Sequence, residues 1–302
     1  MLEVIQPDNK EHWLSMRAQD ITSTEISALF GLSPYSTHYE LWYRKKENLV
    51  VQIEENERMK WGNRLEAAIA HGIAEDNGWK VEPLKCYMRD SSLRMGSSFD
   101  FAIEPDGILE IKNVDSLAFK EGWITDDDCD EAPTHIELQV QHQLALSGRS
   151  FAYIGALVGG NRIKLIRREP NEKIISKIKR KIAEFWQSID DNKPPSPDFK
   201  NDSQFISSLY NYADPGKVYD ASADVEIITL AEKYRLASED EKEAKERKDE
   251  AKAKILMQVS DAEKVISDMF TISAGMIGPA KVEYTRDGYR TFRIHWRKAK
   301  KQ

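Results

Sequence analysis

Three charged side chains stand close together in the stretch from Ser97 to Val114, which reads as two short strands joined by a tight turn. Asp100 lies in the first expected strand, and Glu110 and Lys112 lie in the second. Side chains two residues apart leave a strand on the same face, so Glu110 and Lys112 share a face. The sequence therefore predicts two carboxylates and one ammonium on one patch of a sheet.

The turn between these strands decides which residues face each other. Its residues 104–107, Glu-Pro-Asp-Gly, have the composition of a tight turn. A three-residue loop with the glycine as bulge residue would pair Glu104 with Ile108 and place Asp100 opposite Lys112. The apolar side chains of both strands then point to the other face: Phe99, Phe101, Ile103, Leu109 and Ile111.

This charged patch suits metal-assisted hydrolysis of a phosphodiester. Mg²⁺ takes oxygen ligands, which Asp100, Glu110 and the carbonyl of Ile111 would supply. The metal lowers the pKa of a bound water, and Lys112 orients or deprotonates that water or stabilises the transition-state charge. Glu66, on a preceding helix, would complete a two-metal arrangement. The same side chains also fit a surface ion-pair cluster, which contributes little to stability.

Two further groups of polar residues are candidates for ligand binding. Residues 22–25, Thr-Ser-Thr-Glu, have the spacing of a capping box at a helix start. With Arg17 nearby, the same hydroxyls and free N–H groups also fit a phosphate cradle, although spacing alone favours the cap. On a later expected helix, Gln139 and Gln143 share a face and can orient water or a ligand.

The expected elements alternate helices and strands around these residues. A five-stranded mixed sheet flanked by helices is their natural packing, within an α/β (mixed α+β) fold. The Pro-rich segment 193–197 reads as a linker. It separates a predicted domain over 1–198 from a C-terminal accessory region over 199–302. Helices are expected over 10–17, 22–30, 37–46, 55–78, 135–147, 171–189 and 222–258, strands over 79–87, 95–104, 108–114, 151–158, 162–168, 265–272 and 281–296, and an acidic loop over 115–134.

Composition narrows the class of protein. The chain has 302 residues and a formal net charge of −7, which weighs against coating nucleic acid by bulk attraction but leaves room for a local basic groove. No apolar run approaches the roughly 20 residues that span a bilayer, and no secretory signal is visible at the N-terminus. Two distant cysteines are typical of reduced thiols in a cytoplasmic protein.

Several short motifs occur in an order that resembles a known family. They are W-L-S-M-R, I-T-S-T-E and G-x-S-P-Y within 13–35, W-G-N-R-L-E at 61–66, G-S-S-F-D with E-I-K at 96–112, and Q-V-Q-H-Q-L at 139–144. Over roughly residues 10–190 the chain resembles the phage-type alkaline exonucleases of the YqaJ and lambda exonuclease group, within the PD-(D/E)xK nuclease superfamily. It departs from that pattern at 98–101, where Ser-Phe-Asp-Phe replaces the common Ser-Pro-Asp-Gly.

The resemblance implies a restriction-endonuclease-like core and assigns roles to individual residues. The metal carboxylates would be Asp100 and Glu110, with Lys112 as the catalytic lysine. The two helix residues near the metal site would be Glu66 and Gln139. The 5′-phosphate of a DNA end would be bound by Arg17, Thr24 and Ser98.

The implied activity is a Mg²⁺-dependent 5′→3′ exonuclease, with two ions and with Mn²⁺ as a substitute. It would digest one strand of linear double-stranded DNA and leave 3′ single-stranded tails for phage-type homologous recombination. The implied partners are DNA ends, a single-strand annealing protein and further copies of the chain in a ring. The setting would be the cytoplasm of a bacterial host, with a phage or prophage gene. The alternatives are an endonuclease of the same superfamily and a catalytically inactive DNA-binding protein.

Overall fold

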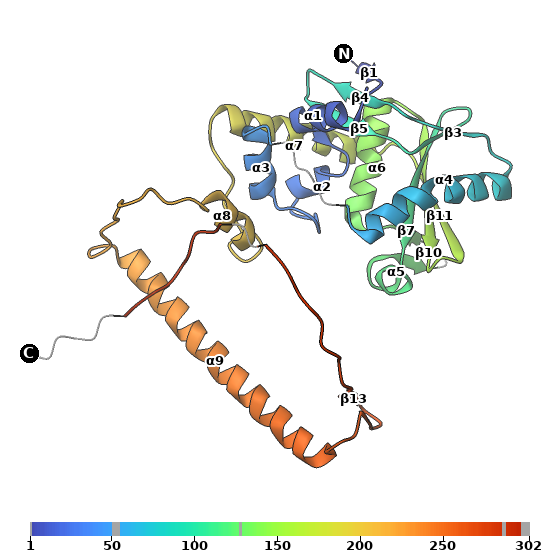
Figure 1. Ribbon diagram of the computed structural model, residues 1–302. Helices are drawn as coiled ribbons and strands as arrows, with labels where there is room; N and C mark the ends of the chain where they lie inside the picture. The colour runs from blue at the N-terminus through green and yellow to red at the C-terminus, as the bar shows by residue number, and fades with distance from the viewer. Residues whose placement is uncertain (1, 50–54, 127–128, 286–287, 297–302) are drawn as a thin grey trace, which may run out of the picture. The chain divides into compact units, whose positions relative to one another are not determined.

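A mixed sheet of five strands, in the order β11-β10-β7-β6-β3, carries Glu110 and Lys112 (Figure 1). The computed structural model describes residues 2–49, 55–126, 129–285 and 288–296. Strands β7 and β10 run parallel, and the other neighbours run antiparallel. The predicted five-stranded mixed sheet is therefore confirmed. Its strands are β3 (Val81–Pro83), β6 (Phe101–Ile103), β7 (Gly107–Val114), β10 (Phe151–Val158) and β11 (Arg162–Arg168).

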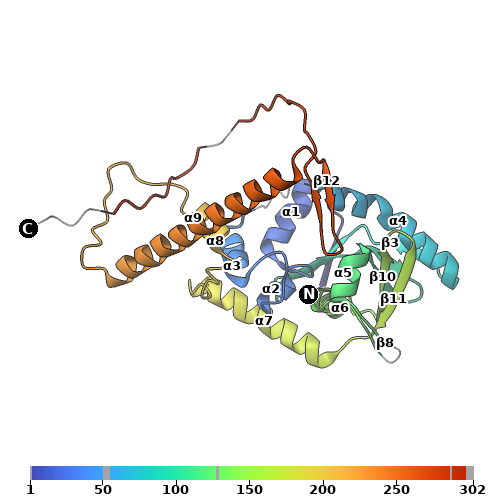
Figure 2. The ribbon, with the colours of Figure 1, turned by 90° about the horizontal axis from the view of Figure 1, so that it is seen from below.

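Two helices cover the two faces of this sheet (Figure 1, Figure 2). Helix α4 (Glu57–Asn77) packs Ile69 and Ile73 against Leu109 and the apolar side chains beside it. Helix α6 (Thr134–Ser147) lies in the other cluster, which contains Ile108. Successive side chains of a strand point to opposite faces, so α4 meets one set of β7 residues and α6 meets the alternate set. Glu110 belongs to the set that faces α6.

A second sheet, in the order β1-β4-β5-β2, was not foreseen from the sequence. The expected strands over 79–87 and 95–104 each divide between the two sheets. The second of them bends at Phe99 and Asp100, where the carbonyl of Asp100 accepts a hydrogen bond from Leu84 N at 3.0 Å. Because the bend interrupts the strand, Phe99 joins the cluster on the α6 side rather than the predicted α4 side. The strands are β1 (Leu2–Ile5), β2 (Ile21–Thr22), β4 (Tyr87–Asp90) and β5 (Met95–Ser98).

The predicted register between β6 and β7 is wrong. Ile108 pairs with Ala102 rather than with Glu104, and Gly107 pairs with Ile103. Gly107 is therefore a strand residue and not the bulge of the turn. A Cβ at this position would lie 2.2 Å from the ring of Phe151 on β10, so close packing explains the glycine. With this shift, Asp100 no longer stands opposite Lys112.

The N-terminal part of the chain contributes short helices. The predicted helix over 37–46 is confirmed as α3 (His38–Lys46), capped by the Thr37 side chain, which accepts from Glu40 N at 3.0 Å. The predicted helix over 22–30 is wrong at its start, because Thr22 belongs to β2 and only a short helix follows. The remaining helices of this region are α1 (Lys10–Gln19) and α2 (Ile26–Leu29), and α7 (Glu172–Asp190) packs against α2 and α3.

The acidic segment over 115–134 is more regular than predicted. It contains helix α5 (Ser116–Gly122), whose first turn donates two backbone hydrogen bonds to the Asp115 side chain. An antiparallel pair follows, β8 (Ile124–Asp126) with β9 (Cys129–Glu131). Asp127 and Asp128, which made this segment look like a loop, lie outside the described residues.

The chain divides into two compact units, Met1–Ile206 and Ser207–Gln302. The predicted division falls slightly earlier, after residue 198. Residues just beyond it contact the first unit, since Asp202 accepts a hydrogen bond from the Thr37 hydroxyl and the ring of Phe205 lies 6.3 Å from that of Tyr39. Helix α8 (Ser203–Leu209) spans the boundary.

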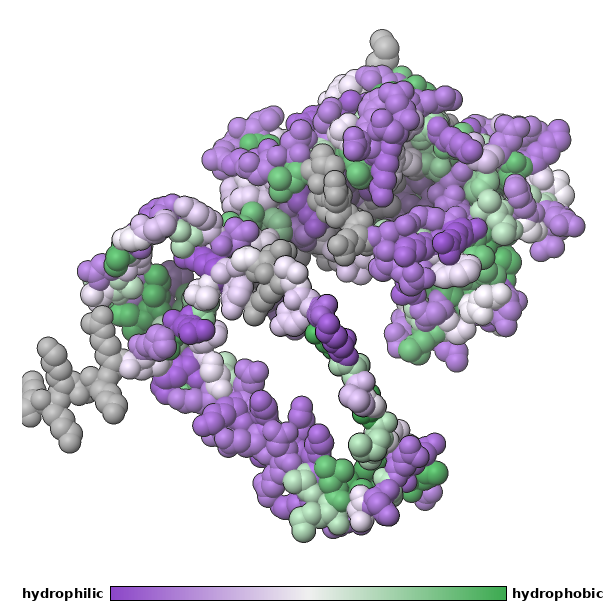
Figure 3. Space-filling model, viewed as in Figure 1, coloured by the Kyte–Doolittle hydropathy of each residue, from purple (hydrophilic) through white to green (hydrophobic). Residues whose placement is uncertain are grey.

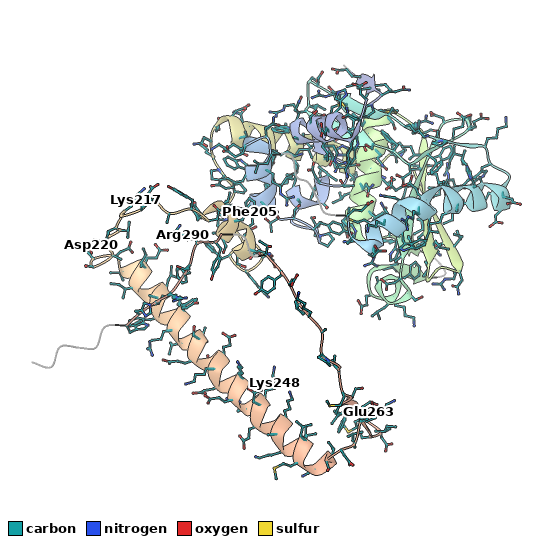
Figure 4. All side chains as sticks on the ribbon, in the orientation of Figure 1. Phe205, Lys217, Asp220, Lys248, Glu263 and Arg290 are labelled. Carbon is teal, nitrogen blue, oxygen red and sulfur yellow. The ribbon has the colours of Figure 1, made fainter. Side chains whose placement is uncertain are left out.

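The second unit is built on one long helix, α9 (Val225–Val259). Figure 3 shows hydrophilic residues along the middle of α9, and Figure 4 shows Lys248 projecting from that part. The short strands β12 (Lys264–Ile266) and β13 (Thr271–Ser273) follow as an antiparallel pair. The strands expected on either side of a turn over 281–296 are absent from the described residues of that range. Across the described chain, every helix is too short or too polar to cross a membrane.

Candidate active site

Glu110 is the centre of a buried polar cluster between β7 and α6. Its side chain is only 4% exposed. One carboxylate oxygen, Oε1, accepts from Lys112 Nζ and from Gln139 Nε2, each at 2.6 Å. The other, Oε2, accepts from Gln143 Nε2 at 2.8 Å. Three donors from two elements therefore fix the position of this carboxylate.

Lys112 is held by the same group of side chains. Besides its bond to Glu110, its ammonium donates to Gln139 Oε1 at 3.2 Å. Burial disfavours the charged form of Lys112, but the carboxylates of Glu110 and Asp100 outweigh burial and raise its pKa. The structure thus presents Lys112 as an ammonium beside two carboxylates, as the spacing of Glu110 and Lys112 on one strand face predicts.

Asp100 reaches the cluster from the bend between β5 and β6. Its Oδ2 accepts from Ile111 N at 2.7 Å, which ties it to the edge of β7 next to Glu110. The N–H and C=O of one strand residue point to the same side of the strand. The Ile111 carbonyl therefore faces the side on which Asp100 lies.

The carboxylates near this patch repel one another. Burial first, and then the charge of Glu110, raises the pKa of Asp100 well above its usual range. The same two causes, in the same order, raise the pKa of Glu66 on α4. Like charges in a site of low polarity disfavour ionisation, and a bound cation removes that cost.

The donor set fits a hard divalent cation such as Mg²⁺. It offers carboxylate oxygens and one backbone carbonyl, and Mg²⁺ is usually held by one or two carboxylates together with several waters. Within the described residues, no three acidic, histidine or cysteine side chains stand close enough to form a closed cage. The arrangement thus fits an open site centred on Asp100 and Glu110, with Glu66 further away.

A second cluster brings together the three residues predicted to bind a 5′-phosphate. Arg17 Nη2 donates to Thr24 Oγ1 at 3.1 Å. The guanidinium of Arg17 also lies 4.7 Å from the ring centroid of Trp13, whose Nε1 donates to Ser98 Oγ at 2.8 Å. Arg17, Thr24 and Ser98 therefore lie in one chain of contacts that runs through Trp13. The capping-box contact also forms, since Thr22 N donates to the Glu25 carboxylate at 3.0 Å, although no long helix follows it.

Gln143 links the two clusters. Its Nε2 donates to the carbonyl of Ser98 at 3.3 Å as well as to Glu110. Ser98 precedes Asp100 by only two residues. Gln143 therefore connects the backbone of Ser98, in the Arg17–Ser98 cluster, to the carboxylate cluster.

The sequence did not mark every residue of this site. Trp13 lies in a recognised motif, but a tryptophan donating to Ser98 has no local signature. Gln143 was predicted to share a helix face with Gln139, and both amides donate to Glu110. Tyr35 is a further neighbour, because its ring packs edge-on against His135 at the start of α6, with the centroids 5.8 Å apart.

His142 lies on the buried side of α6, behind the site. Its Nε2 is 3.1 Å from the carbonyl of Gly96, and its Nδ1 is buried without a partner. Burial, only partly offset by the Gly96 carbonyl, lowers the pKa of His142 to about 4. The folded protein therefore holds this imidazole neutral, with a proton on Nε2.

The free energy of unfolding is expected to fall as the pH drops from about 6.5 to about 4. In this range the unfolded chain binds a proton at His142 and the folded chain does not, which corresponds to roughly 3 kcal/mol. His142→Gln removes the titrating group and keeps a donor for Gly96. Urea unfolding of both proteins across this range measures the difference, and an equal pH dependence in the variant would contradict the assignment.

Two comparisons with known sequences found similar proteins. Residues 12–150 match the sequence profile of the YqaJ-like viral recombinase domain. The chain is 26% identical to the uncharacterized protein YqaJ of Bacillus subtilis (strain 168) in an alignment of 262 residues. This alignment covers 84% of this chain and 80% of that protein.

Two solved structures to which the chain is similar have low sequence identity to it. One is an alkaline exonuclease (LHK-Exo) from Laribacter hongkongensis, which is 16% identical to this chain. The match covers 66% of this chain and 100% of the exonuclease chain, with a TM-score of 0.49. The other is a phage related exonuclease from Haemophilus somnus 129PT, which is 12% identical to this chain. The match covers 63% of this chain and 96% of the exonuclease chain, with a TM-score of 0.42. Residues 12–150 are therefore similar in sequence to the YqaJ-like viral recombinase domain.

Proposed function

We propose that this protein is a Mg²⁺-dependent nuclease that digests one strand of linear double-stranded DNA from its 5′ end and leaves a 3′ single-stranded tail. The observation that carries the proposal is the link through Gln143, which joins the carboxylate cluster to the Arg17–Ser98 cluster. A hydrolytic centre next to a phosphate-binding centre suits cleavage close to a phosphorylated end.

The residues that would hold the metal are Asp100, Glu110 and the Ile111 carbonyl, with Glu66 for a second ion. When bound, Mg²⁺, or Mn²⁺ in its place, activates water and offsets negative charge on the scissile phosphate. Lys112 keeps its proton between Glu110 and Gln139. From there its ammonium stabilises the charge that develops on phosphate oxygens, and Gln139 orients the groups around it.

The end of the DNA would be recognised by Arg17, Thr24 and Ser98. A guanidinium and two hydroxyls are the donors that a terminal phosphate accepts, and charge-assisted bonds of this kind are the stronger ones. Trp13 would support these donors, since it contacts both Arg17 and Ser98. Holding the 5′-phosphate beside the hydrolytic centre favours repeated 5′→3′ cleavage of the same strand.

The proposed setting is phage-type homologous recombination. The 3′ tails would pass to a single-strand annealing protein, and several copies of this chain would form a ring around the duplex. The protein would act in the cytoplasm of a bacterial host as the product of a phage or prophage gene. The YqaJ-like viral recombinase domain supports this setting.

Linear duplex DNA labelled at either end is expected to be digested only when Mg²⁺ or Mn²⁺ is present. The label at a 5′ end should be released first, and the 3′-labelled strand should persist. Covalently closed circular duplex serves as the control and should stay intact. Cutting of the circle would favour an endonuclease, whereas binding of duplex without hydrolysis in either metal would favour an inactive DNA-binding protein.

A further inference from the structure

A buried lysine lies directly behind the Arg17–Thr24 contact. Lys45, in the last turn of α3, is only 6% exposed. Its ammonium donates to Glu25 Oε2 at 2.8 Å and to the backbone carbonyl of Arg17 at 2.6 Å. Burying an ammonium is costly unless it is fully paired, so its contacts point to a specific role.

Glu25 carries the link from Lys45 to the turn that holds Thr24. Its Oε2 also accepts from Thr22 N at 3.0 Å and from Thr22 Oγ1 at 2.8 Å. The Thr22 hydroxyl lies 3.3 Å from that of Thr24, to which Arg17 donates. Lys45 is therefore tied to both halves of the pocket, to Arg17 through its carbonyl and to Thr24 through Glu25 and Thr22.

Charge gives Lys45 a second effect. The carboxylate of Glu25 is 24% exposed and would repel a phosphate held by Arg17 nearby. Burial opposes ionisation of Glu25, but Lys45 and Arg17 outweigh it and lower the pKa of the carboxyl, so the group is charged. With Lys45 present, the sum of these three charges is positive, and without it the charges of Arg17 and Glu25 cancel. The nearby Asp20 is compensated separately by Arg89, 2.8 Å away.

We propose that Lys45 is a positioning residue that, through Glu25, fixes the Arg17–Thr24 pair and gives this pocket its selectivity for a terminal 5′-phosphate over a 5′-hydroxyl. This inference rests on the proposed function. Lys45 itself does not touch the DNA end, because its ammonium is taken up by Glu25 and by the Arg17 carbonyl.

The test compares initial digestion rates on two linear duplexes that differ only in a 5′-phosphate or a 5′-hydroxyl. Arg17→Ala is the reference variant, and its rate ratio should fall to near one. Lys45→Met removes the ammonium and keeps the apolar stem, and its rate ratio is expected to fall about tenfold. The rate on the hydroxyl end should change little. A purely structural role would lower both rates by the same factor and leave the ratio unchanged, which would overturn the inference.

Three companion variants keep the test decisive. Lys45→Arg can still donate to both acceptors and should keep the wild-type ratio. Glu25→Gln removes the carboxylate and retains Lys45, and it should keep or raise the ratio even if Lys45→Met fails to fold. The double variant Glu25→Gln/Lys45→Met should recover the part of the selectivity that depends on charge, since no unpaired carboxylate remains, but not the part that depends on the bonds of Lys45. A ratio near one in Glu25→Gln would contradict the proposal, as would a double variant no better than Lys45→Met.

The wild-type protein separates this inference from the proposed function. Equal digestion of phosphate and hydroxyl ends would overturn the role of Lys45 and leave the nuclease function standing. No digestion of either duplex with Mg²⁺ or Mn²⁺ would overturn both.

Discussion

Asp100→Asn is expected to lower the rate of Mg²⁺-dependent digestion of linear duplex DNA by about a thousandfold or more, since it removes a charged metal ligand. The amide oxygen of asparagine can still accept from Ile111 N, so the bend at Asp100 is retained. Lys112→Ala should cause a similar loss, because the ammonium between Glu110 and Gln139 disappears.

The two variants should have opposite effects on stability. Burial and the charge of Glu110 raise the pKa of Asp100, so at pH 8 its carboxylate destabilises the folded metal-free protein. Asp100→Asn should therefore raise the melting temperature, whereas Lys112→Ala should lower it by leaving Glu110 with one fewer cationic partner. Digestion rates and thermal melting in EDTA measure the two effects.

Glu82→Gln is the matched control for both measurements. Glu82 is an exposed carboxylate on the edge strand β3 of the same sheet. Its amide variant should digest DNA and melt like the wild type. Undiminished digestion by Asp100→Asn or by Lys112→Ala would refute the site assignment.

Local sequence pattern predicted the elements that position the site. The strands over 151–158 and 162–168 have the predicted bounds because Gly159, Gly160 and Asn161 mark the turn between them. The helices over 55–78 and 135–147 end at Gly78 and Gly148, which both adopt the left-handed conformation of a C-cap. These features depend on residues close in the chain.

Features that depend on distant residues were missed. The register of β6 on β7 follows from the packing of Phe151 over Gly107, and these two residues lie far apart in the sequence. The bend at Asp100 divides one expected strand between two sheets, and no turn residue marks it. The strand register and the position of the bend are therefore set by contacts between residues distant in the sequence, and not by the residues of the local turn.

The charged residues behind the phosphate pocket show the same limit. Lys45 lies in the run Arg44-Lys45-Lys46, which reads as an exposed basic helix end. Only the position of α3 against α1 and the Thr22–Glu25 turn makes the middle residue buried. The Thr22–Glu25 spacing predicted a local contact correctly, but the contact stabilises a strand end rather than a long helix.

Gly96→Ala is expected to be the most destabilising single methyl addition at the glycines of the first unit. A Cβ at Gly96 would lie 2.0 Å from the hydroxyl oxygen of Tyr87 and 2.8 Å from Oδ2 of Asp20. Both side chains are fully buried, and the Tyr87 hydroxyl donates to Asp20 at 3.1 Å. The added methyl therefore forces a ring aside and breaks a buried hydrogen bond.

The cost of Gly96→Ala should be about 3 kcal/mol or more from overpacking and the lost bond together. For a unit of this size that loss corresponds to a fall of roughly 6–12 °C in melting temperature. The shift should extend to function, because β5 also carries Ser98 and pairs with β2 next to the Thr24 turn. Selectivity for a 5′-phosphate should therefore decline along with stability.

Gly72→Ala provides the matched control, since it adds the same methyl group at another glycine of the same unit. Gly72 is exposed within α4, and no atom lies within 4 Å of its ideal Cβ position. Alanine is the better helix former, so this variant should be about 0.5–1 kcal/mol more stable than the wild type. Thermal and urea unfolding of the wild type and the two variants compare a methyl group added at the closely packed Gly96 with one added at the open Gly72. Equal stability of Gly96→Ala and Gly72→Ala would contradict this prediction. It would mean that Tyr87 and Asp20 can move apart without loss of stability, and that their close packing against β5 does not hold Ser98 in place.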